Sequence, residues 1–132
     1  MFGVGPARVL RFRPVIGWSE EDGAEGLLHV VVERDGELAV VQVEGELDVA
    51  TAPRLAQHLD ALLAEQPQPR VVLHCEALEF CDSIGLSTLL RAAGARPGGA
   101  PLVLRRPHEN VQRVLDLAGV EHVFELDPPP AP

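Results

Sequence analysis

The sequence has few cysteines, and they are too widely spaced for a metal site. Cys75 and Cys81 are the only two, whereas a structural zinc site needs more ligands at tighter spacing. None of the five histidines forms a helical pair with either of them. We therefore expect no metal, a buried thiol in a strand at Cys75 and a partly covered thiol in a loop at Cys81. A disulfide between them is disfavoured in a reducing compartment.

Basic residues and long apolar runs are also scarce. Lysine and arginine together number 11 against 20 acidic residues, which gives a net charge of −9 and argues against non-specific binding to nucleic acid. No apolar run approaches the roughly 20 residues of a membrane-spanning helix. Arg8, Arg11 and Arg13 interrupt the apolar residues near the N-terminus, unlike the continuous core of a secretory signal. We therefore expect a cytoplasmic protein.

The usual catalytic motifs are missing. The chain has no Gly-rich phosphate loop with lysine, no His-Glu-x-x-His run and no Gly-x-Ser-x-Gly elbow. Glu46, Asp48 and Asp82 would form the carboxylate cluster of a hydrolase if the fold brought them together. The other interpretation of Asp48 is that it caps the turn after a strand. We expect no independent enzyme and no cofactor.

The sequence does contain the pattern of a single domain. A chain of 132 residues is normally one domain. Residues 1–26 are punctuated by Gly and Pro and are predicted to be an N-terminal extension, with a short strand over 9–13 as the alternative to a poorly ordered arm. Residues 27–126 form the predicted domain. Residues 127–132 are a Pro-rich tail that continues neither helix nor sheet.

Strands and helices alternate along the predicted domain. Runs of aliphatic residues predict strands over 28–34, 37–43, 70–75, 101–105 and 120–126. A tight turn at 35–36 joins the first two strands, and 45–48 is predicted as a loop. Helices are predicted from Thr51, Ser83 and Pro107. Their apolar faces are Leu55, Leu59, Leu62 and Leu63; Leu86, Leu89, Leu90 and Ala93; and Val111, Val114, Leu115 and Ala118.

This order, ββαβαβαβ, predicts an α/β fold. Strands joined through helices form right-handed crossovers and parallel pairs, and the opening hairpin adds one antiparallel edge strand. We therefore expect a mixed, mostly parallel five-stranded sheet with helices covering it.

The most informative segment is 79–90, where the chain passes from a loop into a helix. Asp82 and Ser83 lie where that helix begins, and Ser is a preferred N-cap. One interpretation is that these residues only cap the helix. The other is that Ser83 accepts a phosphate, which adds about −1.5 to −2 charges. The first-turn amides and the macrodipole would hold that anion, so Ser83 would be a switch.

Three stretches of the chain, in this order, resemble the STAS domain family. The first is 45–48 followed by 51–55, and the second is 70–73 followed by 80–86. The third comprises Leu104, Pro107, Val111, Arg113, Leu115, Leu117, Gly119 and Phe124. Together they cover about 28–126 and are most similar to the small stand-alone anti-sigma-factor antagonists.

The resemblance implies a protein-binding switch. Such antagonists bind an anti-sigma factor that is also a serine kinase of the histidine-kinase-like ATPase type. Phosphorylation of a loop serine dissolves the complex, and a phosphoserine phosphatase restores it. The kinase supplies the base and Mg-ATP, because a serine hydroxyl is a weak nucleophile. Carried over, the phosphorylated residue is Ser83. The partner-binding residues are Asp48, Asp82, Ser83, Ile84, Gly85 and Leu86, with Gly85 allowing close approach.

Three features depart from the family pattern. His74 stands where an acidic residue is usual, Ile84 and Ser87 replace small residues, and the last helix has no counterpart. An apolar surface left open by that helix would be covered by a homodimer or by the N-terminal arm. The alternative function is a non-phosphorylated STAS scaffold subunit of a lipid-transport or sensory complex. The two functions differ in whether Ser83 is modified.

Overall fold

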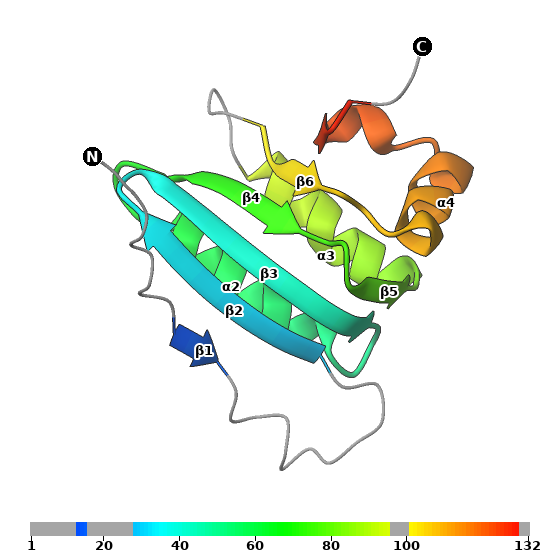
Figure 1. Cartoon of the computed structure of the whole chain (residues 1–132), viewed down its shortest axis with the longest axis horizontal. Helices are drawn as coiled ribbons and strands as arrows, with labels where there is room; N and C mark the ends of the chain where they lie inside the picture. The colour runs from blue at the N-terminus through cyan, green and yellow to red at the C-terminus, as the bar shows by residue number, and fades with distance from the viewer. Residues whose placement is uncertain (1–12, 16–27, 96–100, 130–132) are drawn as a thin grey trace.

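The computed structural model describes residues 13–15, 28–95 and 101–129. Most of the predicted extension 1–26 lies outside the described residues, and so does part of the tail. Within these ranges a single mixed sheet carries three helices, which confirms the predicted α/β fold (Figure 1).

The sheet has seven strands in the described part of the chain. They are β1 (Arg13–Val15), β2 (Leu28–Asp35), β3 (Leu38–Leu47), β4 (Arg70–His74), β5 (Leu78–Cys81), β6 (Val103–Arg105) and β7 (Glu125–Asp127). Their order across the sheet is β1-β2-β3-β4-β6-β7, and β5 pairs with β3. The β1/β2 and β2/β3 pairs are antiparallel, and the remaining four pairs are parallel. The predicted mostly parallel sheet is therefore confirmed.

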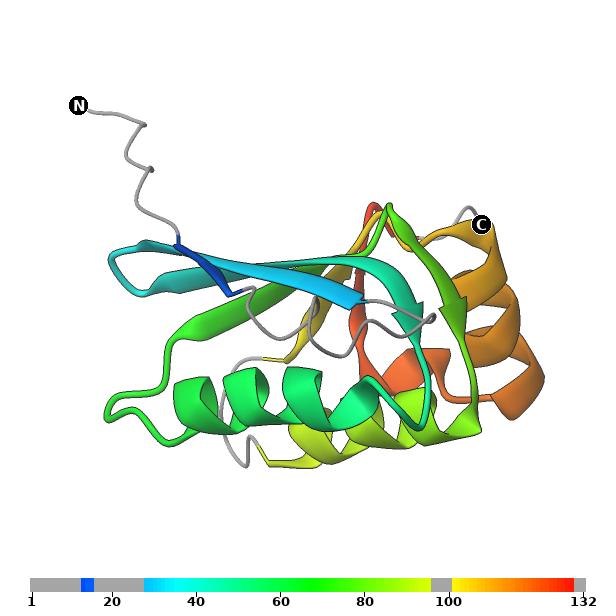
Figure 2. The same cartoon turned by 90° about the horizontal axis from the view of Figure 1, so that it is seen from below.

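The helices are α2 (Ala52–Leu63), α3 (Ser83–Gly94) and α4 (Glu109–Ala118), with a short 3-10 helix, η2 (Glu121–Val123), before β7. Figure 2 shows α2 and α3 lying side by side under one face of the sheet, where they pack against each other. Helix α4 packs against β5 at one end of the molecule. Among the described residues, none of the helices is long and apolar enough to cross a bilayer.

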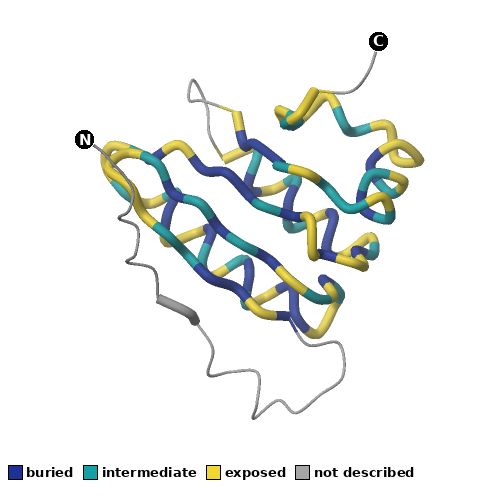
Figure 3. The backbone as a smooth tube through the Cα atoms, in the orientation of Figure 1, coloured by how far each residue is buried: buried dark blue, intermediate teal, exposed yellow. Residues whose placement is uncertain are grey.

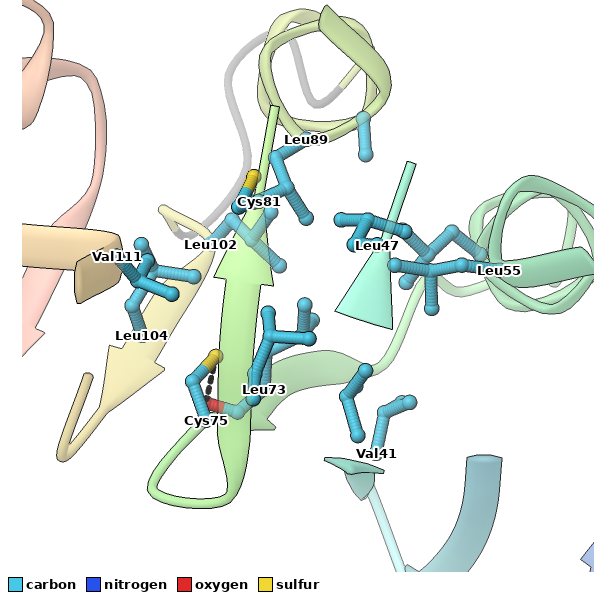
Figure 4. Packing of buried hydrophobic residues seen from close by; sticks show 14 of the residues in the cluster. Val41, Leu47, Leu55, Leu73, Cys75, Cys81, Leu89, Leu102, Leu104 and Val111 are labelled. Carbon is cyan, nitrogen blue, oxygen red and sulfur yellow. Dashed lines mark hydrogen bonds between the residues drawn. The ribbon is translucent and has the colours of Figure 1, made fainter. Parts of the chain in front are cut away.

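The hydrophobic core fills the space between the sheet and its helices (Figures 3 and 4). In β3 the buried residues Ala39, Val41 and Val43 alternate with less buried ones, as expected for a strand with one face toward a core. The largest fully buried side chains are Leu28, Leu47, Leu55, Leu59, Leu73, Leu78, Leu89, Leu102, Leu104, Leu115, Val41 and Val43.

The predicted helix faces are largely correct. Their buried members are Leu55, Leu59, Leu62, Leu86, Leu89, Val111 and Leu115. Their partly buried members are Leu63, Leu90, Ala93 and Val114. Ala118 is exposed instead, because it is the last residue of α4 and Gly119 then turns the chain in a left-handed conformation.

Several predicted boundaries were wrong. The segment 45–48 was predicted as a loop, but β3 continues to Leu47 because β5 supplies a parallel partner there. The last strand was predicted over 120–126, but it is only Glu125–Asp127 and follows η2. Helix α4 begins at Glu109 and not at Pro107, because His108 is its N-cap and accepts a hydrogen bond from the Asn110 amide.

Two short strands were not among the five predicted ones. The segment that forms strand β5 was predicted as a loop. Its two central residues are both exposed, so its side chains lack the alternation of buried and exposed residues by which a strand is predicted. Strand β1 lies in the predicted extension, slightly beyond the 9–13 stretch for which a strand was the alternative. It pairs antiparallel with β2, with Arg13 opposite Val32.

Candidate functional site

Ser83 lies where three elements meet at one end of the sheet. The chain enters from β5, in which Cys81 pairs with Leu47 at the end of β3. The amide of the next residue, Asp82, donates a hydrogen bond to the Leu47 carbonyl at 3.2 Å. Helix α3 then begins at Ser83. The start of α3 is therefore fixed to the end of β3.

Asp82, and not Ser83, caps this helix. Its backbone is extended and its Oδ1 accepts a hydrogen bond from the Gly85 amide at 2.8 Å. Its carbonyl accepts the first helical bond from Leu86 at 2.9 Å. The sequence offered both Asp82 and Ser83 as capping residues, and in the structure Asp82 is the cap, because its carboxylate takes the orphan amide.

The Ser83 side chain is left free by this arrangement. It is the first helical residue and is exposed. Within the described residues its hydroxyl makes no hydrogen bond, while its carbonyl accepts one from the Ser87 hydroxyl at 3.0 Å. The fold thus presents an accessible hydroxyl that it does not use for its own stability.

Gly85 is a site of close backbone approach within the chain. A Cβ added to Gly85 would lie 2.7 Å from both the Cγ and the carbonyl oxygen of Leu47. Gly85 and Leu86 are buried, whereas 47% of Ile84 is exposed. Of these three predicted binding residues, only Ile84 is exposed. Gly85 and Leu86 hold the segment in place.

Asp48 caps the turn between β3 and α2. Its Oδ1 accepts hydrogen bonds from the Ala50 amide at 3.0 Å and from the Thr51 amide at 3.1 Å. The Thr51 hydroxyl donates to the Glu46 carbonyl at 2.8 Å and accepts from the Asp48 amide at 2.9 Å. Thr51 occupies the predicted N-cap position, but its hydroxyl bonds to the preceding turn and not to the helix.

The fold brings the predicted carboxylates to one end of the sheet. Glu46 is exposed and pairs in register with Phe80, while Asp48 and Asp82 flank the Leu47 position. No ion pair involves these three carboxylates within the part of the chain that the structure describes. That part also contains no group of three or more His, Cys, Asp or Glu residues arranged to hold a metal ion.

The same end carries three exposed residues that were not predicted as part of the site: Val49, Glu79 and Phe80. An apolar residue in a sequence normally predicts burial, so Val49 and Phe80 were assigned no role. Val49 did give one signal, since it is an apolar residue in a turn between Asp48 and the N-cap Thr51.

Both cysteines are buried and free. Burial, with a smaller contribution from Cys81, raises the pKa of Cys75 to about 12. Burial, with a smaller contribution from Asp82, raises the pKa of Cys81 to about 12. The Cys75 thiol lies 3.5 Å from the Leu73 carbonyl (Figure 4). Cys81 was predicted to be partly covered in a loop, but it is buried at the end of β5. Both thiols are packing groups.

His74, one of the departures from the family pattern, lies away from Ser83. Its Nε2 is buried, has no hydrogen-bond partner among the residues that the structure describes, and is 3.6 Å from the nearest carboxylate oxygen of Glu76. Both residues line a hollow of about 330 Å³ together with Gln42, Val43, Glu44 and Ala77. This lining shares no residue with the end of the sheet that carries Ser83.

Comparison with known proteins identifies the family of this fold. A family model described as Mlab, STAS domain, matches residues 30–126, which is the whole predicted domain apart from its first residues. The chain belongs to the STAS domain family.

Similar proteins include several antagonists. The anti-sigma F factor antagonist of Paenibacillus polymyxa is 27% identical over 100 residues, which are 75% of this chain and 86% of that protein. An anti-sigma factor antagonist from Mycobacterium paratuberculosis has a crystal structure with a TM-score of 0.71 and 29% identity, over 82% of this chain and 90% of that chain. The Bacillus cell fate determinant SpoIIAA, solved in its phosphorylated form, shares the fold with a TM-score of 0.58 and 20% identity, over 74% of this chain and 89% of that chain.

Proposed function

We propose that this STAS domain is an anti-sigma-factor antagonist that is switched off by phosphorylation of Ser83. Its partner is an anti-sigma factor that is also a serine kinase of the histidine-kinase-like ATPase type. The observation that carries the proposal is the Ser83 hydroxyl, which is exposed on the first turn of α3 and makes no hydrogen bond within the described residues. The similar proteins from Paenibacillus and Mycobacterium, both named as antagonists, support the same role.

The electrostatics around Ser83 favour ejection of a partner by phosphate. Asp82 already occupies the Gly85 amide, so a phosphate on Ser83 would add about −1.5 to −2 charges beside an existing carboxylate. If a partner covered the phosphate without pairing it, desolvation would cost several kcal/mol. Because each 1.4 kcal/mol is about tenfold in affinity, one phosphate is sufficient to dissolve the complex.

In this proposal the chain itself catalyses nothing. The kinase supplies the catalytic base and Mg-ATP, because an unactivated serine hydroxyl is a weak nucleophile. A separate phosphoserine phosphatase restores the binding form. The protein acts in the cytoplasm and regulates transcription indirectly through the freed sigma factor.

The test compares four forms of the chain: wild type, Ser83→Ala, Ser83→Glu and Ser87→Ala. Ser87 is the matched control because it is exposed one turn later on the same helix. We expect wild type, Ser83→Ala and Ser87→Ala to capture a histidine-kinase-like anti-sigma factor from native lysate, and Ser83→Glu to lose it. With that kinase and ATP, wild type and Ser87→Ala should incorporate phosphate and Ser83→Ala should not. Phosphorylation of Ser83→Ala, or equal binding of Ser83→Ala and Ser83→Glu, contradicts the switch.

The second candidate is a non-phosphorylated scaffold subunit of a lipid-transport or sensory complex. The observation that favours it is the description of the matching family model. The model is described as Mlab, STAS domain, and its description does not name anti-sigma-factor antagonists. The same four forms separate the two functions. A scaffold would capture the same transport or sensory proteins with all four.

A further inference from the structure

Exposed apolar side chains gather at the end of the sheet that carries Ser83. In the described part of the chain five large apolar residues are exposed, and three of them are at this end: Val49 (68%), Phe80 (47%) and Ile84 (47%). The other two, Leu117 and Val123, lie at the last turn of α4 and in η2. Three exposed apolar residues around one exposed serine are more than the scattered ones a surface normally carries.

The three residues come from three different segments, and each segment is next to Leu47. Phe80 is in β5, next to Cys81, which pairs with Leu47. Ile84 is in the first turn of α3, next to Gly85, which lies against Leu47. Val49 follows Leu47 by two residues in the turn before α2. Their common position is therefore built into the backbone and does not depend on flexible side chains.

Carboxylates surround these apolar residues. Glu46 and Glu79 are exposed, and Asp48 and Asp82 are half-buried caps. None of these four takes part in an ion pair within the described residues. The Asn110 side chain donates a hydrogen bond to the Glu79 carbonyl at 2.9 Å, so α4 fixes the backbone of β5 at this point. The surface therefore has exposed apolar residues at its centre and four carboxylates at its rim.

We propose that Val49, Phe80 and Ile84 form the apolar centre of a docking surface for a protein that presents an apolar patch flanked by lysine or arginine. The proposal rests on the proposed function, in which the protein that docks here is the anti-sigma factor. The negative charge of this surface determines which kind of molecule can bind there. A second copy of this chain would bring two acidic rims together, and nucleic acid or an anionic membrane would be repelled in the same way.

The two parts of the surface affect binding differently. Aromatic anchors at the centre of an interface contribute strongly to affinity, so Phe80→Ala should weaken binding at least tenfold. Rim charges act mainly on the association rate and on its salt dependence. A Glu46→Gln/Glu79→Gln variant should therefore associate several times more slowly at low salt, and its association rate should fall less as salt is raised.

The experiment titrates the purified anti-sigma factor obtained with the wild-type chain against each variant. Leu117→Ala is the apolar control, because Leu117 is 82% exposed at the other end of α4. Glu37→Gln is the acidic control, because Glu37 is exposed in the turn between β2 and β3, at the opposite end of the sheet. Circular dichroism establishes that each variant folds. The controls should bind like wild type.

The outcomes separate this proposal from the proposed function. If Phe80→Ala and the double glutamate variant bind the anti-sigma factor like their controls, the docking surface is wrong although the function stands. If the wild-type chain captures a transport or sensory protein in place of an anti-sigma factor, the proposed function is wrong. The same titration against that protein then tests the docking surface. Weaker binding by Phe80→Ala supports the surface, and unchanged binding overturns it.

Discussion

Gly85 in α3 lies so close to Leu47 at the end of β3 that any side chain on it would clash. A Cβ at this position would be 2.7 Å from both the Leu47 carbonyl oxygen and its Cγ, and the backbone cannot yield as a flexible side chain would. We expect Gly85→Ala to lower the free energy of unfolding by about 1–3 kcal/mol, the usual result of overpacking. Urea denaturation measures it through a lower midpoint.

Gly94 provides the matched control in the same helix. A Cβ at Gly94 would meet nothing within 4 Å, so Gly94→Ala should leave stability unchanged or raise it by up to about 1 kcal/mol through helix propensity. If both alanine variants have the same midpoint, the close contact at Leu47 has no energetic consequence.

The Asp82 cap should stabilise the start of α3. Removing the carboxylate in Asp82→Ala leaves the Gly85 amide without its 2.8 Å partner, and loss of an N-cap costs about 0.5–2 kcal/mol. Asp82→Asn keeps an accepting oxygen and should stay close to wild type. Thermal unfolding of the three proteins measures the difference. An asparagine variant as unstable as the alanine variant would show that the charge, and not the hydrogen bond, is what matters.

Thr51 should hold the turn that carries Asp48. Its side chain is buried, with 1% exposed, and its hydroxyl bonds to the Glu46 carbonyl and the Asp48 amide. Thr51→Val leaves both groups without this partner and should cost about 1–3 kcal/mol. Thr51→Ser keeps the hydroxyl and loses one methyl group, about 0.8 kcal/mol. If denaturant unfolding showed Thr51→Ser to be no more stable than Thr51→Val, this account would be contradicted.

The two thiols should be inert in the folded protein. Burial raises the pKa of each to about 12, so at pH 8 the thiolate is about a thousandfold rarer than in an ordinary cysteine, and access is also blocked. We expect Ellman's reagent to react with neither Cys75 nor Cys81 until guanidinium unfolds the chain, and then with two thiols. Rapid reaction of the native protein would show that one thiol is accessible.

The same burial predicts a loss of stability at alkaline pH. Each unfolded thiol loses its proton near pH 9, whereas the folded one keeps it until about 12. Stability is therefore fully present below pH 9 and falls as the pH rises from 9 toward 12, since the unfolded state then binds fewer protons. The chain has no tyrosine and no lysine, so no other side chain titrates in this window. A Cys75→Ala/Cys81→Ala variant should have a flat profile over this range, and an equal fall would contradict the assignment.

Much of the fold could be predicted from the sequence, because its larger elements bury one apolar face at a regular period. The faces of α2 and α4 around Leu55 and Leu115 are examples. Strand β5 could not be predicted in this way, since Glu79 and Phe80 are both exposed and the four residues have no period. Its partner, the end of β3, contains Gly45 and Glu46, which are rare in strands and are held there by a pairing that no local pattern shows.

The candidate site could be predicted in position but not in detail. The sequence placed Asp82 and Ser83 at a helix start, and it could not tell which residue caps the helix, because both are good caps. Gly85 was expected to admit a partner, but its neighbour is Leu47, 38 residues earlier in the chain. Contacts of this kind depend on how β3, β5 and α3 come together, which local periodicity does not report.

The free hydroxyl of Ser83 has an evolutionary consequence. Because the fold makes no use of that oxygen among its described contacts, a Ser83→Ala change would remove the proposed phosphorylation site without disturbing the helix, whose cap lies on the neighbouring residue. Under the proposed function, regulated and permanently active versions of such a domain would be separated by one codon. Selection could pass between them in either direction without first repairing the scaffold.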